Sequence, residues 1–194
     1  MPIAAVGALA AMTTAAGAGD VINFKMVRSA ASTAAGCLPG ASAEVKIESL
    51  GEVERMTVVA HKLPRKTDFD LFVIQLADAP FGLSWYQGDM ESNGSGDAQG
   101  TFIGRFNIET FIVAPGTGPA PVVHHQPIPD ADENPATGPV HTFHLGLWFN
   151  SPDDAAAAGC LTAVTPFNGE HNAGVQALST RQFAADHGPL RRLR

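Results

Sequence analysis

The sequence is poor in charged and aromatic residues. Charged residues make up 16% of the 194 residues and aromatic residues 7%, with one tyrosine and two tryptophans. Basic residues are especially few, since 12 Lys and Arg stand against 19 Asp and Glu and leave a net charge of −7. A protein that binds nucleic acid through its overall charge has the opposite balance, so we expect no nucleic-acid partner.

Long hydrophobic runs and nucleotide-binding motifs are also missing. No stretch approaches the ~20 apolar residues of a membrane-spanning helix, so we expect no transmembrane segment. No helix is opened by G-x-x-x-x-G-K-[ST] or G-x-G-x-x-G, and the nucleophile motif G-x-S-x-G does not occur. Nucleotide-dependent enzymes and α/β-hydrolases are therefore not indicated.

The N-terminus and the cysteines favour an exported protein. Residues 1–18 are uncharged and end in Ala16-Gly17-Ala18, which is typical of the apolar region and cleavage site of a signal peptide. The basic residue that usually stands before the apolar run of a signal peptide is missing. The only two cysteines, Cys37 and Cys160, form an even count that predicts one disulfide in an oxidising compartment. We therefore predict a secreted, extracellular protein.

The remaining chain reads as an N-terminal extension, residues 19–40, followed by a single domain, residues 41–194. Residues 43–48 alternate small or apolar with charged side chains, as a half-buried strand does, and residues 53–60 form a second, β-branched run. Residues 68–75 alternate at first and then become continuously apolar. Further strands are expected around Trp85, over residues 99–106 and over residues 140–149. Asn93-Gly94 and the residues after it supply the turn of a hairpin between two of these strands.

Proline and capping residues mark the other segments. Residues 114–139 contain seven prolines and no periodicity, which predicts a long surface loop. Ser151-Pro152 followed by an acidic pair and closed by Gly159 predicts a short helix over residues 151–158. A second short helix is expected over residues 180–187. Together these signals predict an all-β, immunoglobulin-like β-sandwich with short C-terminal helices, with a jelly roll or small barrel as the alternative.

A loop between two expected strands has the oxygen spacing of a calcium site. Asp89, Glu91, Asn93 and Asp97 stand at positions one, three, five and nine around a central glycine. Position twelve is Gly100 rather than a bidentate glutamate, and the flanking segments are strands rather than helices. A polar turn without calcium explains the same residues.

Histidines offer a second candidate metal site. Four of the seven are His124, His125, His141 and His144, and folding can bring them together with His171 to bind zinc or copper. The spacing of three between His141 and His144 places their side chains on opposite faces of a regular strand. Solvated or hydrogen-bonded histidines without a metal are the alternative.

Two further groups are candidates for chemistry and for binding. Glu170 and His171 lie in a polar loop and can act as acid and base. The same residues are also typical of an ordinary polar turn that has no catalytic role. Trp85, Tyr86 and Trp148 can form a platform for sugar rings. Alternation places Trp85 and Tyr86 on opposite faces of a strand, so we expect one of these two side chains to pack in the core. We also expect at least one of the two tryptophans, Trp85 and Trp148, to be buried.

The sequence thus predicts a secreted, non-enzymatic β-sandwich module that binds a cell-surface component, a glycan or a protein. This prediction depends on the signal-like start, the acidic composition and the lack of a catalytic motif, and it includes no obligatory cofactor. The alternatives are an extracellular zinc or copper enzyme that uses the clustered histidines, and a structural protein stabilised by calcium.

Overall fold

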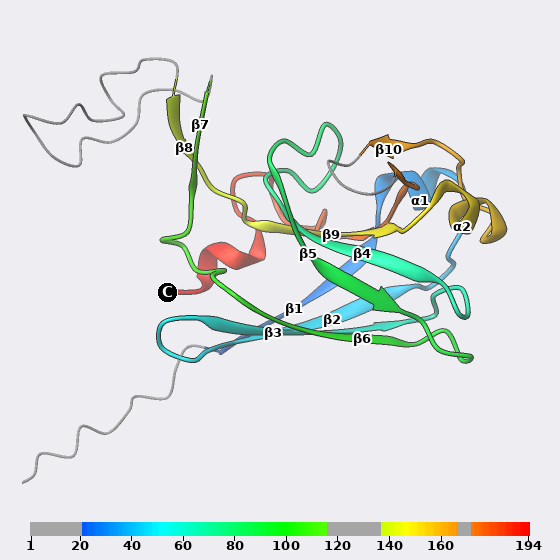
Figure 1. Cartoon of the computed structure of the whole chain (residues 1–194), viewed down its shortest axis with the longest axis horizontal. Coiled ribbons are helices and arrows are strands. Elements are labelled where there is room, and N and C mark those ends of the chain that lie inside the picture. The colour runs from blue at the N-terminus through cyan, green and yellow to red at the C-terminus, as the bar shows by residue number, and fades with distance from the viewer. Residues whose placement is uncertain (1–20, 116–136, 167–171) are drawn as a thin grey trace, which may run out of the picture.

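The computed structural model describes residues 21–115, 137–166 and 172–194, and its largest unit is an eight-stranded antiparallel sheet (Figure 1). The strands lie in the spatial order β5-β4-β9-β12-β1-β2-β3-β6. Their bounds are β1 (Val21–Arg28), β2 (Ser42–Ser49), β3 (Glu54–His61), β4 (Asp68–Ile74), β5 (Ser84–Glu91), β6 (Ala98–Gly104), β9 (His144–Phe149) and β12 (Gln176–Ser179).

Short elements complete the described fold. Two small antiparallel sheets pair β7 with β8 and β10 with β11. The bounds are β7 (Ile112–Pro115), β8 (Thr137–Val140), β10 (Thr165–Pro166), β11 (Asn172–Ala173), α1 (Ala30–Ala34), α2 (Pro152–Ala157) and the 3₁₀ helix η2 (Pro189–Arg192). The prediction of an all-β protein with short helices is confirmed. No helix in the described ranges has the length and apolarity needed to cross a membrane.

The main sheet curls until it is nearly closed. β1 pairs with β2 through Met26 and with β12 at Val27 and Arg28, so this one strand joins the two halves of the sheet. The end strands β5 and β6 are consecutive in the chain and lie near one another (Figure 1). No ladder of hydrogen bonds joins them within the described residues. The sheet therefore keeps two edges that face each other across a gap.

The turn over residues 92–97 explains why β5 and β6 do not form the expected hairpin. The turn is closed by a bond from the Asn93 amide to the Asp97 carbonyl at 2.8 Å, and its backbone also bonds to the connection between β3 and β4. The Leu63 amide donates to the Gly96 carbonyl at 2.9 Å, and the Ser92 amide donates to the Thr67 carbonyl at 3.0 Å. These bonds let β5 pair with β4 while β6 pairs with β3.

The two faces of the sheet bury different sets of side chains. Alternate residues of β4 from Phe69 to Val73 face the main core together with Met90 of β5. The positions between them project from the outer face, because successive side chains of a strand point to opposite sides. Phe72 and Ile74 on that face belong to a second, smaller apolar cluster.

The C-terminal segment closes one end of the main core. Leu190 and Leu193 are fully buried and pack within the core cluster, although both lie at the end of the chain. The Leu190 amide donates to the Phe143 carbonyl at 3.2 Å, and the Ile108 amide donates to the Leu193 carbonyl at 2.9 Å. These contacts attach η2 both to the start of β9 and to the segment after β6.

A disulfide connects the segment after α1 with the end of α2. The sulfur atoms of Cys37 and Cys160 are 2.00 Å apart and close a loop with a sequence separation of 123 residues. Both cysteines are buried within the main core cluster. The predicted disulfide is confirmed, and it indicates an oxidising environment.

The local signals for α2 act as expected. The Ser151 hydroxyl accepts a hydrogen bond from the Asp154 amide at 3.1 Å, Pro152 occupies the first turn and Gly159 has a φ of +71°. Residues 181–187, where a second helix was expected, instead form turns. η2 begins after them at Pro189, whose fixed φ suits the first helical position.

β1 lies inside the segment that the sequence pattern left as an extension. Buried Phe24 and Met26 alternate with exposed Asn23 and Lys25, so the strand pattern is present. Only eight residues carry it, and no Gly, Pro, Asn or Asp turn separates it from the Ala-rich residues of α1. The described sheet therefore begins at Val21 rather than near residue 43.

Candidate functional site

Two large aromatic side chains lie next to each other on the edge strand β5. Trp85 is 57% exposed and Tyr86 is 51% exposed. Trp85 pairs with Val73 and projects from the core-facing side of the sheet, whereas Tyr86 pairs with Phe72 and projects from the outer face. Neither side chain packs in the core, because the sheet ends at this strand. The prediction that one of the two would be a core residue is therefore wrong.

Tyr86 rests on a row of buried aromatic rings. Its ring centroid is 5.4 Å from that of Phe72, which lies 5.5 Å from Trp148, and Phe81 packs edge-on against Trp148 at 5.0 Å. Trp148 is only 1% exposed, so it supports the surface from below and does not reach it. The structure thus brings Trp85 and Tyr86 together at the surface and places Trp148 beneath.

Carboxylates continue the outer face of β5 beyond the aromatic residues. The Tyr86 hydroxyl donates to Asp89 Oδ1 at 2.6 Å. Across the β4–β5 ladder, Asp68 faces Glu91 and Asp70 faces Asp89. Asp70 is buried, whereas Asp68, Asp89 and Glu91 are exposed.

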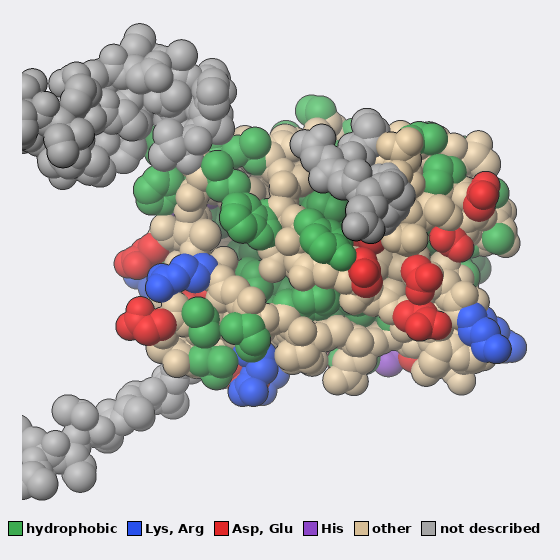
Figure 2. All heavy atoms as spheres, in the orientation of Figure 1, with side chains coloured by type: hydrophobic (Ala, Val, Ile, Leu, Met, Phe, Trp, Pro, Cys, Tyr) green, Lys and Arg blue, Asp and Glu red, His purple; other side chains and the backbone are tan. Residues whose placement is uncertain are grey.

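These groups form a continuous surface, which we call the β5 surface and define by Ser84–Glu91 and Asp68. Figure 2 shows hydrophobic side chains over the N-terminal part of β5 and acidic side chains over its C-terminal part. The same view shows the molecule hollowed between β5 and β6, with hydrophobic side chains on the floor. Among the aromatic side chains there, the Phe102 ring of β6 lies against Gly88.

The oxygen-rich loop after β5 is held by its own hydrogen bonds. Asn93 Oδ1 accepts from the amides of Ser95 and Asp97, at 2.8 and 3.1 Å. Asp97 Oδ1 lies 2.8 Å from His61 Nδ1, and Asp89 is bonded to Tyr86. The four candidate calcium ligands Asp89, Glu91, Asn93 and Asp97 are thus divided between the strand and the turn, as the polar-turn alternative describes.

The described histidines each contact different residues. The His141 ring stacks on Phe143 with centroids 4.9 Å apart, and a second ring, Phe111, lies at 6.0 Å. Within the described ranges no group of three or more His, Cys, Asp or Glu residues is arranged to hold a metal ion. His124, His125, Glu170 and His171 lie outside those ranges.

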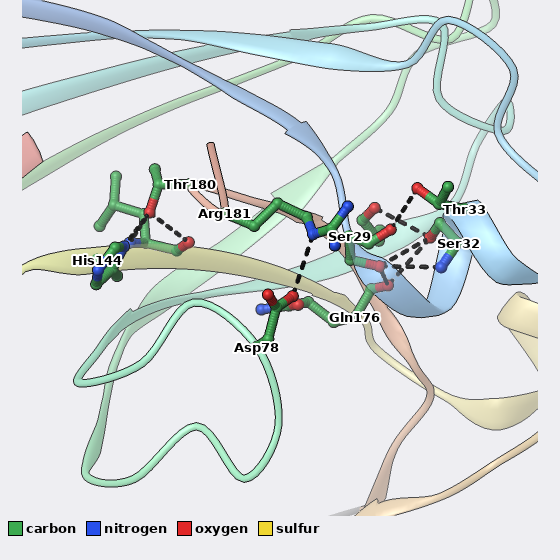
Figure 3. A network of polar contacts seen from close by, with 10 residues as sticks. Ser29, Ser32, Thr33, Asp78, His144, Gln176, Thr180 and Arg181 are labelled. Carbon is green, nitrogen blue, oxygen red and sulfur yellow. Dashed lines mark hydrogen bonds and ion pairs between the residues drawn. The ribbon is translucent and has the colours of Figure 1, made fainter. Parts of the chain in front are cut away.

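His144 takes part in a buried polar network (Figure 3). Its Nδ1 lies 2.9 Å from the Thr180 hydroxyl and its Nε2 lies 3.0 Å from the Ala185 carbonyl. Because a carbonyl only accepts, Nε2 carries the proton and Nδ1 accepts from Thr180. The distance between the Thr180 hydroxyl and the His144 imidazole is that of a catalytic nucleophile and its general base. Both side chains are fully buried, however, so no substrate reaches them.

A second part of the network fixes α1 to β12 (Figure 3). The hydroxyls of Ser29 and Ser32 both donate to the backbone carbonyl of Gln176, and the Ser32 amide donates to Ser29 Oγ at 3.0 Å. Nearby, Arg181 Nε bonds Asp78 Oδ1 at 3.2 Å. These hydroxyls are occupied by structural hydrogen bonds, and neither pairs with a histidine.

Acidification is expected to destabilise the protein through His144. Burial lowers the pKa of this imidazole, so the unfolded chain takes up a proton near the ordinary pKa of about 6.5 while the folded protein does not. Stability is therefore unaffected by this group above that pH and falls as the pH drops below it, with a slope approaching ~1.4 kcal/mol per pH unit. Urea unfolding at about pH 7.5 and about pH 5 measures the loss.

The control for that experiment replaces one buried and one exposed histidine. His144→Gln is expected to flatten the difference between the two pH values, whereas exposed His187→Gln is expected to keep it. Equal slopes in the wild type and in His144→Gln would show that His144 does not carry the effect.

Sequence reasoning identified Trp85, Tyr86 and Asp89 but did not single out Asp68 and Asp70. The alternation Asp68-Phe69-Asp70 placed both carboxylates on one face of a strand. The sequence did not reveal that β5 pairs with β4. In this pairing Glu91 lies opposite Asp68 and Asp89 lies opposite Asp70.

Comparison with known proteins provides no external assignment for this surface, because no family model, curated protein or solved structure matches the chain.

Proposed function

We propose that this protein is a secreted, non-enzymatic binding module with an immunoglobulin-like sandwich fold, and that the β5 surface contacts its ligand. The observation that carries this proposal is the pair of adjacent aromatic side chains, Trp85 and Tyr86, each more than half exposed on a strand at the sheet edge. The ligand is a cell-surface component, either a glycan or a protein.

The physical basis is the combination of apolar area and rigidity. Trp and Tyr provide large contact areas at a low cost in side-chain entropy, and they are enriched where binding energy is concentrated. Tyr86 is held by Phe72 beneath it and by its hydrogen bond to Asp89, so less entropy is lost when a ligand binds.

Export is supported by separate features. The disulfide between Cys37 and Cys160 favours an oxidising compartment, and residues 1–18 have the composition of a signal peptide. Native mass spectrometry of protein from the culture medium of its host tests this part of the proposal. The expected species has lost the N-terminal segment and has a mass two hydrogens below that of the reduced chain.

Replacing the exposed aromatic residues is expected to remove binding without unfolding the protein. Trp85→Ala and Tyr86→Ala each delete an exposed ring, and truncation of such anchors typically costs ~2 kcal/mol or more of binding energy, about a 30-fold loss in affinity. The measurement is the fraction of each purified variant that is retained on isolated cell walls of the host, and on immobilised surface proteins of the host.

The matched control is Leu161→Ala, which removes a large side chain that is 47% exposed in the segment after α2. This variant should be retained like the wild type, and circular dichroism should show that all variants are folded. Equal retention of Trp85→Ala, Tyr86→Ala and the wild type on every surface fraction would contradict the proposed function.

A further inference from the structure

On the basis of that proposed function, we infer that the ligand is an extended polypeptide whose basic and apolar side chains alternate. It adds as a strand along the free edge of β5 at residues 84–87, in the gap between β5 and β6. Main-chain hydrogen bonds supply part of the affinity in this mode, and alternate side chains supply specificity.

The first step is the free edge itself. β5 ends the eight-strand order, and one of its edges pairs with β4 while its other edge pairs with no described strand. Toward the turn, the Phe102 ring of β6 reaches Gly88 and fills the space between the two end strands. Ser84, Trp85 and Tyr86 at the N-terminal part of β5 are exposed, and Figure 2 shows a hollow beside this part of the strand, so we assign the accessible part of the edge to residues 84–87.

The second step concerns the two aromatic residues, which favour a strand over a sugar chain. Trp85 projects from the core-facing side of the sheet and Tyr86 from the outer face, as their partners Val73 and Phe72 show. Rings on opposite faces do not form one flat platform for a glycan. An added strand contacts both, because its own side chains also alternate between the two faces.

The third step assigns the chemistry of each face. On the core-facing side, the next strand meets Trp85 and the hydrophobic floor of the gap, so its side chains there are apolar. On the outer side, it meets the Tyr86 ring with the Asp89 carboxylate bonded to it, and Glu91 and Asp68 follow. An ammonium or guanidinium group interacts favourably with both the ring and the carboxylate.

The same charges disfavour a second copy of this chain as the occupant. Two copies that each carry a net charge of −7 repel each other. A basic partner is instead attracted from a distance by the negative charge of the protein.

Defined peptides test this inference without altering the protein. The probe is acetyl-Lys-Val-Lys-Val-Lys-Val-Lys-amide, compared with a block peptide of the same composition, a Glu-for-Lys version and a version N-methylated at alternate residues. The alternating probe is expected to bind, and isothermal titration calorimetry measures its affinity. N-methylation on the bonded edge should weaken binding about tenfold, because two hydrogen bonds of ordinary net strength are lost.

Variants of the protein locate the peptide. Trp85→Ala and Tyr86→Ala are expected to weaken binding of the alternating probe at least tenfold, whereas Leu161→Ala leaves it unchanged. Asp89→Asn should weaken it and reduce its dependence on salt, and Asp153→Asn on α2, also an exposed carboxylate, should do neither.

Three results would overturn the inference. The first is equal binding of the alternating, block and N-methylated peptides, which would indicate nonspecific charge attraction. The second is absence of peptide binding together with Trp85-dependent binding of chito-oligosaccharides, which would leave the proposed function intact and make its ligand a glycan. The third is absence of probe binding together with Trp85-dependent self-association in analytical ultracentrifugation.

Discussion

The double variant Leu190→Ala/Leu193→Ala is expected to lose its cooperative unfolding transition or to retain only marginal stability. Both side chains are fully buried in the main core, and removing a buried leucine side chain costs about 2–5 kcal/mol. The two losses together approach the ~5–15 kcal/mol that stabilises an ordinary domain. Equilibrium unfolding in urea, followed by circular dichroism and tryptophan fluorescence, measures the change.

The two single leucine variants and a variant at the exposed neighbour Arg194 serve as controls for this prediction. Each single leucine variant should unfold cooperatively with a lowered midpoint, and Arg194→Ala at the exposed last residue should behave like the wild type. If both single leucine variants lost less than about 1 kcal/mol, well below the range for a buried leucine, η2 would not close the core in solution.

Removal of the disulfide is expected to produce the second large loss. The bridge between Cys37 and Cys160 closes a loop with a sequence separation of 123 residues, and restricting an unfolded chain over a loop of this size stabilises the fold by roughly 4–5 kcal/mol. Cys37→Ala/Cys160→Ala should therefore unfold at a clearly lower urea concentration than the oxidised wild type.

The reduced wild-type protein provides the matching control. In the presence of dithiothreitol its unfolding midpoint should fall to about that of the double variant, because both chains then lack the cross-link. A midpoint that stays at the oxidised value after the loss of the bridge is verified by mass would contradict the stabilising role assigned to it.

The strands that the sequence predicted are those whose patterns are bounded by turn residues. Residues 43–48, 53–60 and 68–75 correspond closely to β2, β3 and β4, and Ser151 begins α2 as its capping pattern indicates. The pairing of β5 and β6 with different partners was not predictable, because it depends on hydrogen bonds between residues 92–97 and residues 63–67. Such long-range choices leave no periodic signal in the sequence.

The candidate site was predictable only in its side-chain types. The sequence identified Trp85 and Tyr86 and placed them on opposite faces, which the pairing with Val73 and Phe72 matches. The expectation that at least one tryptophan is buried is confirmed by Trp148 on the interior strand β9, whereas the expectation that Trp85 or Tyr86 packs in the core is wrong. Exposure depends on where a strand lies in the sheet, and the strand order is a property of the whole chain.

The position of β1 has a consequence for how the protein folds. The hydroxyl of Ser29, directly after this strand, bonds to Gln176, 147 residues later in the chain, and β1 itself pairs with β12. Contacts between such distant segments form slowly, because a long stretch of chain must be ordered to bring them together. The two halves of the sheet cannot join until nearly the whole chain has been synthesised. The main sheet of a growing chain therefore stays open between β1 and β12 until residues 176–179 have been synthesised.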